Sequence, residues 1–221
     1  MIKRSIIARS PLGEIMCFFA FFCNLCQKPI YSLAKHISSG AELKQDNEIM
    51  LSVKEGDIQK LGKLFDRHSK RLYNYFRLQV RSRSKSEDLV QNVFYNILRY
   101  RHTYKDGASF TAWMYTIARN EKINHFKKNN FPEGKIDPEL SDEKSNNPEN
   151  DLEHKTDIYH LNMALERIPA DSRELLILSK FTELPYSQIA KITGCTTGAV
   201  KVRIYRALKK LKGEFVKISG A

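Results

Sequence analysis

The chain lacks the residue combinations that mark most enzymes, although its 221 residues allow one or two domains with real cores. Its six histidines are scattered along the sequence. There is no HExxH pair, no Walker-type phosphate loop and no GxSxG nucleophile elbow. Pairs of acidic residues fall in a polar linker or at expected helix starts. We therefore expect a non-enzyme with no catalytic residues.

Cysteine is also scarce, with Cys17, Cys23 and Cys26 close together and Cys195 far away. Four cysteines placed so unevenly do not form a disulfide framework, so we expect a reduced, cytoplasmic setting. The first three could be interpreted as metal ligands. However, no second pair follows at the usual zinc spacing, and phenylalanines fill the gaps. We expect no metal site and no cofactor.

No apolar run is long enough to span a membrane. The most apolar stretch, Ile15–Leu25, has 11 residues, whereas a transmembrane helix needs about 20. The preceding Lys3, Arg4 and Arg9 imitate a signal peptide, but no clean cleavage site follows. Residues 1–49 therefore have three interpretations: an over-long start ahead of Met50, a secretion or membrane signal, or a genuine extra element. The first domain is expected to begin at residue 50.

Acidic residues are outnumbered, with 37 Lys and Arg against 25 Asp and Glu and a net charge of +12. The local balance is +2 over residues 1–49, +10 over 50–128, −6 over 129–160 and +6 over 161–221. Two basic segments joined by an acidic one favour binding to a polyanion such as nucleic acid, in a salt-sensitive way. Mild basicity alone is also common among soluble proteins.

The C-terminal part predicts a helix-turn-helix over residues 186–212. A short amphipathic helix runs into Gly194, and Thr196 can cap a longer second helix. That helix repeats apolar residues at spacings of 4, 4 and 3 from Val200 to Leu211 and carries six Lys and Arg on its other faces. Such a basic second helix is typical of insertion into the DNA major groove.

Residues 50–128 predict four helices and no strand. Asp57 can cap the first helix, a second covers 71–80, and Ser84 or Ser86 can cap the third. A loop containing Gly107 then interrupts the pattern, and Ser109 can cap a long fourth helix to about residue 128.

Residues 129–153 contain three prolines and almost no large apolar residues, so they cannot bury enough surface to fold alone. We expect a flexible acidic linker there. The fold class is therefore all-α, with two small helical domains over residues 50–128 and 154–217.

Segments in both predicted domains resemble a known family. Conserved region 2 of bacterial RNA polymerase sigma factors is similar to SEDLVQNVFYNIL and FTAWMYTIARNEKINHFKK, and region 4 is similar to GCTTGAVKVRIYRALKKL. The order of the two regions and the direct linker resemble the extracytoplasmic-function subfamily. The resemblance implies an alternative sigma factor that binds core RNA polymerase, recognises minus-35 and minus-10 promoter elements and helps to melt DNA for initiation.

The resemblance also implies partners and site residues. The partners are the clamp helices and flap of core RNA polymerase, promoter DNA and an anti-sigma factor. The polymerase-binding residues are Asp88, Leu89, Gln91 and Asn92. The minus-35 residues are Thr196, Thr197, Lys201, Val202, Arg203 and Arg206. The minus-10 residues are Tyr104, Lys105, Asp106, Gly107, Ala108, Ser109, Trp113, Arg119, Asn120, Asn124 and Lys127.

Some of these positions depart from the family or have a second interpretation. Relatives often carry an acidic residue at Asn92, Asp at Asn124 and Ser at Val202. We expect Val202 to touch a thymine methyl group instead of donating a hydrogen bond. Arg119 could equally be held in an internal ion pair.

Two other functions compete with this interpretation. A simple DNA-binding regulator could end in the same helix-turn-helix, but it would need a receiver or ligand domain, and residues 50–128 show no alternating strands. A membrane-associated interaction protein could use Phe18 to Phe22. Co-purification with core RNA polymerase separates both from a sigma factor.

Overall fold

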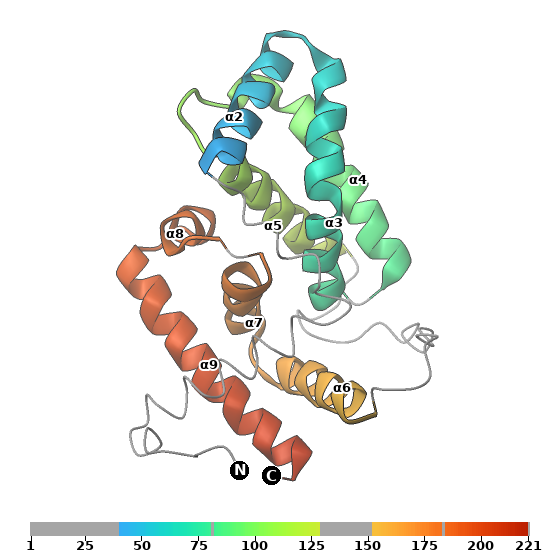
Figure 1. The fold of residues 1–221 in the computed structure, drawn as a ribbon, viewed down its shortest axis with the longest axis vertical. Helices are drawn as coiled ribbons and strands as arrows, with labels where there is room; N and C mark the ends of the chain where they lie inside the picture. Colours follow the sequence, from blue (N-terminus) through green and yellow to red (C-terminus); the bar gives the residue numbers. More distant parts are fainter. Residues whose placement is uncertain (1–39, 81, 129–151, 183, 221) are drawn as a thin grey trace, which may run out of the picture.

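The computed structural model describes residues 40–80, 82–128, 152–182 and 184–220, and their regular structure is entirely helical. The helices form two lobes, which Figure 1 shows one above the other. The first lobe covers residues 40–128 and the second covers residues 152–220. The predicted all-α class is therefore confirmed. Within the described ranges, no helix combines the length and the apolar character needed to cross a bilayer.

Four α-helices and two short 3-10 turns build the first lobe. Their bounds are α2 Gly40–Glu55, η1 Ile58–Lys60, α3 Leu61–Val80, α4 Arg83–Arg99, η2 Arg101–Thr103 and α5 Phe110–Lys128. The apolar stripes of α3, α4 and α5 face one another, and the large side chains of Tyr75, Phe76, Ile97, Phe110 and Met114 are fully buried between them.

The first lobe begins ahead of the boundary that composition predicts. Met50 is completely buried in the middle of α2 and does not start a domain. The polar residues before it are structural, because Asp46 is 3% exposed and accepts hydrogen bonds from His68 and Arg67 of α3. A boundary at residue 49 separates Asp46 from the helix that it binds. Hydrophobic periodicity does not reveal such a contact, because both partners are polar.

The two helices predicted on either side of residues 66–70 form one continuous helix, α3. This polar stretch contains no Gly or Pro, so nothing in it breaks the helix. Asp57 precedes only the short turn η1 and makes no side-chain capping bond. Its carboxylate lies 3.1 Å from the Lys60 ammonium instead.

The cap of α4 also differs from the prediction. Ser82, rather than Ser84 or Ser86, precedes the helix, and its hydroxyl accepts a hydrogen bond from the Lys85 N–H at 3.4 Å. Ser86 is buried and donates to the Ser82 carbonyl at 2.6 Å. The helix therefore starts one turn earlier than its first acidic residues suggested.

The second lobe is a small bundle around one long helix. Its elements are α6 Leu152–Arg167, α7 Ala170–Leu176, the π-helical turn η3 Ile177–Phe181, α8 Tyr186–Thr193 and α9 Thr197–Ser219. Helices α6, α7 and α8 all pack against α9. Phe181 is partly buried and packs against the core of this lobe. That core includes the buried residues Ile168, Leu175, Leu176, Leu178, Ile189, Val200 and Ile204.

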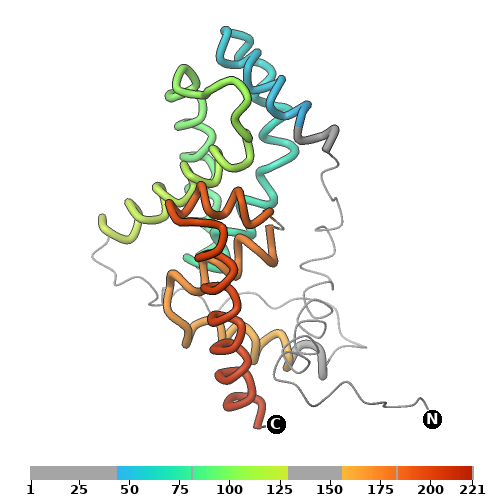
Figure 2. Tube along the Cα trace, turned by 90° about the vertical axis from the view of Figure 1, so that its left-hand side faces the viewer, coloured from blue at the N-terminus to red at the C-terminus, as the bar shows by residue number. Residues whose placement is uncertain are grey.

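The two lobes are in contact. Helix α8 packs against α5, and the turn η3 packs against α3. Figures 1 and 2 show the second lobe below the first, with α8 beside α5. The expectations for the three N-terminal cysteines, for Phe18 to Phe22 and for the acidic segment 129–151 fall outside the described residues.

Candidate nucleic-acid interface

Helix α9 has a basic side, and the cap at the N-terminus of the helix helps to set its direction. The Thr196 hydroxyl accepts a hydrogen bond from the Ala199 N–H at 3.2 Å, which confirms the predicted cap. Gly194 ends α8 with a positive φ of 68°, a conformation that glycine adopts without steric cost. The turn between the helices is therefore fixed at both sides, and it sets the direction in which α9 leaves the lobe.

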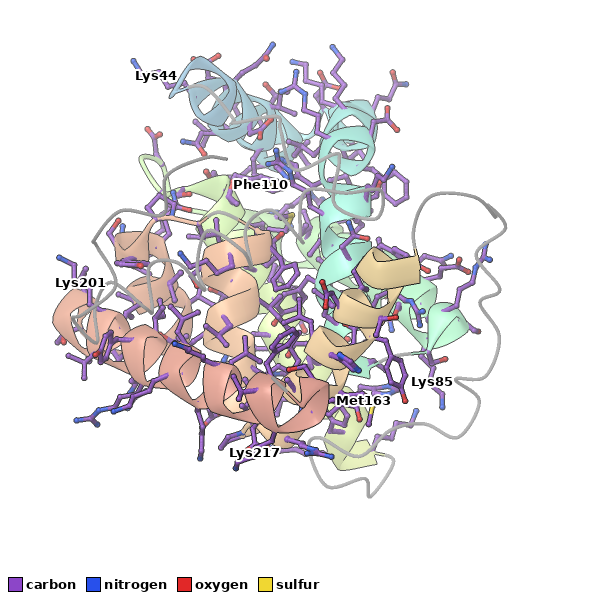
Figure 3. The ribbon with its side chains drawn as sticks, turned by 60° about the horizontal axis from the view of Figure 1, so that its bottom comes forward. Lys44, Lys85, Phe110, Met163, Lys201 and Lys217 are labelled. Carbon is purple, nitrogen blue, oxygen red and sulfur yellow. The ribbon has the colours of Figure 1, made fainter. Side chains whose placement is uncertain are left out.

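One side of α9 is buried and the other is solvent-exposed. Val200, Ile204, Leu208 and Leu211 face the lobe. All six predicted minus-35 residues, Thr196, Thr197, Lys201, Val202, Arg203 and Arg206, are exposed. Figure 3 shows Lys201 and Lys217 near opposite ends of α9, at the outer edge of the second lobe. Such a convex, cationic helix side suits contact with a duplex groove and its phosphates.

Tyr205 also lies on this exposed side and is not among the predicted residues. It is 40% exposed and follows Val202, which is 48% exposed, by three positions. That spacing places both on the same side of a helix and could have identified the tyrosine. Together they add an apolar element to an otherwise charged surface.

The loop before α5 is held from beneath by α2. Lys54 donates to the Tyr104 carbonyl at 2.7 Å, and the Asn47 side-chain oxygen accepts from the Phe110 N–H at 2.8 Å. Asn47 also accepts from the Tyr104 hydroxyl at 3.3 Å. The predicted Ser109 cap is confirmed, with its hydroxyl accepting from the Ala112 N–H at 3.3 Å. Asn47 and Lys54 thus fix both ends of a loop far away in sequence.

Tyr104 belongs to the interior of this loop and not to its surface. It is 1% exposed, its hydroxyl donates to the Ala108 carbonyl at 2.6 Å, and its ring lies 5.2 Å from that of Trp113. Burial raises the pKa of Tyr104 to about 12, and the carboxylates of Asp106 and Asp46 contribute to the rise. The hydroxyl therefore stays protonated as a donor. Direct base contact by Tyr104 does not fit this arrangement.

The exposed part of the loop is shorter than the predicted segment. Lys105, Asp106 and Gly107 are exposed, while Ala108 and Ser109 are half-buried. Gly107 has a φ of +73° and donates its N–H to the Asp106 carboxylate at 2.8 Å. A base that is unstacked from DNA would meet these three residues first.

The predicted residues of α5 divide into two groups. Asn120, Asn124 and Lys127 are exposed. Arg119 is half-buried, and its Nε lies 3.2 Å from a carboxylate oxygen of Glu174 in the second lobe. The internal ion pair that the sequence left open for Arg119 is therefore present. Trp113 is half-buried against the core.

Helix α4 offers a separate exposed surface. Asp88, Gln91 and Asn92 are exposed, and Tyr95 beside them is 63% exposed. Leu89, which the resemblance placed in the same surface, is 3% exposed and packs in the core. Its side chain is turned by about 100° from that of Asp88 and by about 160° from that of Gln91, which directs it toward the core.

Among the side chains that the structure describes, no three His, Cys, Asp or Glu residues gather in a group that could hold a metal ion. The exposed surfaces instead carry cations and polar side chains, and the N-termini of α5 and α9 are capped. Surfaces of this composition bind nucleic acid by phosphate contacts and by groove or base contacts.

Comparison with known proteins matches the chain to one protein family. The family model for Sigma-70 region 2 matches residues 64–131, and that for Sigma-70, region 4 matches residues 161–211. RNA polymerase sigma factor CarQ of Myxococcus xanthus is 30% identical over 152 residues, covering 67% of this chain and 85% of CarQ. ECF RNA polymerase sigma factor BldN of Streptomyces coelicolor is 29% identical over 167 residues, covering 74% of this chain and 63% of BldN.

Two solved structures share the fold. The sigma factor RpoE in complex with the anti-sigma factor NepR from Bartonella quintana aligns with a TM-score of 0.56 and 25% identity, covering 71% of this chain and 96% of RpoE. CnrH in complex with the cytosolic domain of CnrY aligns with a TM-score of 0.59 and 19% identity, covering 76% of this chain and 95% of CnrH. The second likeness concerns the fold alone.

Proposed function

Because the chain belongs to the extracytoplasmic-function sigma factors of bacterial RNA polymerase, which direct promoter recognition and transcription initiation, we propose that its two lobes divide the promoter between them. The second lobe binds the minus-35 element as duplex, and the first lobe binds the minus-10 element as it opens. The observation that supports this division most directly is the exposed cationic side of α9, set apart from the loop that precedes α5.

For the minus-35 element, the proposed contacts follow the exposure of α9. Thr196 and Thr197 at the helix N-terminus approach a phosphate with their hydroxyls and N–H groups. Lys201, Arg203 and Arg206 contact phosphates or base edges in the major groove, and Val202 packs against a thymine methyl group.

For the minus-10 element, the proposed contacts are the exposed loop residues Lys105, Asp106 and Gly107. Ala108 and Ser109 form the rear of the loop, and Tyr104 with Trp113 supports it from within. Asn120, Asn124 and Lys127 on α5 assist strand separation, together with Arg119 once its carboxylate partner is removed. Asn47 and Lys54 hold the loop in position without touching DNA themselves.

For core RNA polymerase, we propose a contact through Asp88, Gln91 and Asn92 on α4, with Leu89 supporting them from the core. The clamp helices and the flap of the polymerase are the expected docking sites. The polymerase performs all chemistry, so this chain acts as a non-catalytic subunit in the cytoplasm. By analogy with RpoE, whose structure was solved with NepR, we propose that an anti-sigma protein controls the chain.

The test is reconstituted transcription with the full chain and core RNA polymerase on genomic DNA, followed by mapping of start sites. We expect a small set of start sites that is absent without the chain. Upstream of these sites, two short shared sequence elements should recur at a constant spacing. Start sites identical to those of the core enzyme alone, or no retention of the chain by the polymerase, would contradict the proposal.

A further inference from the structure

A buried carboxylate joins the two lobes. Glu174 of α7 is 2% exposed, and its three donors all come from the first lobe. The Tyr75 hydroxyl donates to Oε1 at 2.8 Å, the Lys122 ammonium lies 3.1 Å from the same oxygen, and Arg119 Nε donates to Oε2 at 3.2 Å. We call Tyr75, Arg119 and Lys122 the carboxylate pocket.

The carboxylate pocket favours an anion because two of its donors, Lys122 and Tyr75, are buried. Their polar groups are therefore removed from water where they meet Glu174. Removing one partner of a buried ion pair is strongly unfavourable. The pKa of Tyr75 is raised by burial and by the charge of Glu174, so its hydroxyl remains a hydrogen-bond donor. We call the arrangement in which the two lobes touch the closed form. Its contact between the lobes depends on the Glu174 charge.

The closed contact conflicts with binding to both promoter elements at once. Elements centred near minus-35 and minus-10 are separated by ~25 base pairs, or roughly 85 Å of duplex at 3.4 Å per pair. In the closed form the lobes touch, α8 covers part of α5, and Arg119 is engaged by Glu174. The lobes must separate before the chain can contact both elements.

We propose that Glu174 is an intramolecular latch that occupies an anion site on the first lobe, and that a DNA backbone phosphate takes the same site when the lobes open. The carboxylate pocket would then have two alternative ligands of the same chemistry. Closing the latch masks Arg119 and keeps the free chain from binding DNA. The phosphate part of this proposal rests on the proposed minus-10 function of α5.

The test compares Glu174→Gln with Glu214→Gln in the full chain. The change from glutamate to glutamine keeps the size of the side chain and removes its charge. Glu214 lies on α9, where its partners Lys217 and Arg167 belong to the same lobe. Both variants therefore change the net charge equally, but only one changes the pocket. Small-angle scattering measures lobe separation, and fluorescence anisotropy with a short oligothymidylate measures single-strand affinity.

We expect Glu174→Gln to increase the radius of gyration and to bind oligothymidylate at least about fivefold more tightly than Glu214→Gln, a typical size for coupling between two sites. Adding Lys122→Gln to Glu174→Gln should remove the gain in affinity. Equal affinities of Glu174→Gln and Glu214→Gln would overturn the latch. A gain that survives Lys122→Gln would overturn the shared phosphate site.

Tyr75→Phe keeps the proposal testable if Glu174→Gln unfolds the second lobe. It removes one of the three donors to Glu174, and circular dichroism should show unchanged helix content. It should open the lobes in the same direction but to a smaller extent, whereas wild-type scattering together with wild-type affinity would contradict the latch. These measurements need no polymerase, so their failure is distinct from a failure of the chain to direct initiation.

Discussion

Val202 and Tyr205 give the exposed side of α9 an apolar character that its cations do not require. Lys201, Arg203 and Arg206 would suffice for phosphate binding, which carries little sequence information. An exposed valine beside them can distinguish thymine by its methyl group. At the scale of single residues, we therefore expect Val202 to contribute to the base preference of the second lobe.

We predict that Val202→Ser weakens the preference for thymine at one position of the minus-35 element. The loss of one methyl contact corresponds to about 1 kcal/mol, or roughly fivefold in relative affinity. Competition binding with duplexes that vary one base at a time would measure it. Val216→Ser, on the same helix beyond the basic segment and 39% exposed, is the control. An unchanged base profile in Val202→Ser would contradict the contact.

At the scale of the element, α2 makes hydrogen bonds both to α3 and to the loop before α5. Asn47 adds a second cap to the local Ser109 cap at the start of α5, because its oxygen accepts from the Phe110 N–H across 63 positions of sequence. A buried N–H left without this acceptor is costly, and helix caps contribute about 1 kcal/mol. The geometry of the loop before α5 is therefore a property of α2 as well as of the loop itself.

We predict that Asn47→Ala lowers the stability of the first lobe by about 1 kcal/mol and reduces promoter opening more than promoter binding. Thermal unfolding would measure the first effect, and permanganate reactivity of unpaired thymines would measure the second. Ser52→Ala is the matched control, because Ser52 donates to the Glu48 carbonyl within α2. If both variants open the promoter equally well, Asn47 does not position the loop.

Asp46 makes the attachment of α2 sensitive to acid. Burial raises the pKa of Asp46, but hydrogen bonds and charge from His68 and Arg67 outweigh this effect and hold the pKa below its usual value. A carboxyl group with a lowered pKa in the folded state stabilises the fold above its unfolded pKa, and this contribution is lost as the pH falls through the folded value.

We therefore predict that Asp46→Asn destabilises the protein at neutral pH by about 2 kcal/mol, the scale of a hydrogen bond to a charged group. The difference from wild type should shrink as the pH falls below about 4. Urea unfolding at several pH values would measure it. A difference that stays constant down to strong acid would contradict the role of the carboxylate. A chain that begins at Met50 would lack this group altogether.

At the scale of the whole molecule, local patterns predicted the elements but not their connections. The four-residue spacing on α9 and the caps Thr196 and Ser109 depend on neighbours in sequence, so they were predictable. The bond from Tyr75 to Glu174 spans 99 positions and leaves no periodic trace in the sequence. The same reason explains why residues 40–49, the first part of α2, are not predicted to belong to the first lobe.

The proposed opening of the lobes also requires that the segment between them is long enough to span the two promoter elements. From Lys128 to Leu152 the chain has enough residues to span at most ~80 Å when fully extended. Removing residues 135–146 shortens this reach by ~40 Å. A tether that cannot span two sites prevents simultaneous binding, although each site keeps its own affinity.

We predict that this deletion abolishes initiation at promoters of natural spacing, while the affinity for an isolated minus-35 duplex is unchanged. Reconstituted transcription and duplex binding would measure the two effects. Replacing residues 135–146 with an equally long Gly and Ser sequence is the control, and it should restore initiation if reach alone matters. If that replacement also abolishes initiation, the acidic side chains of the segment contribute directly, and the limit is electrostatic and not geometric.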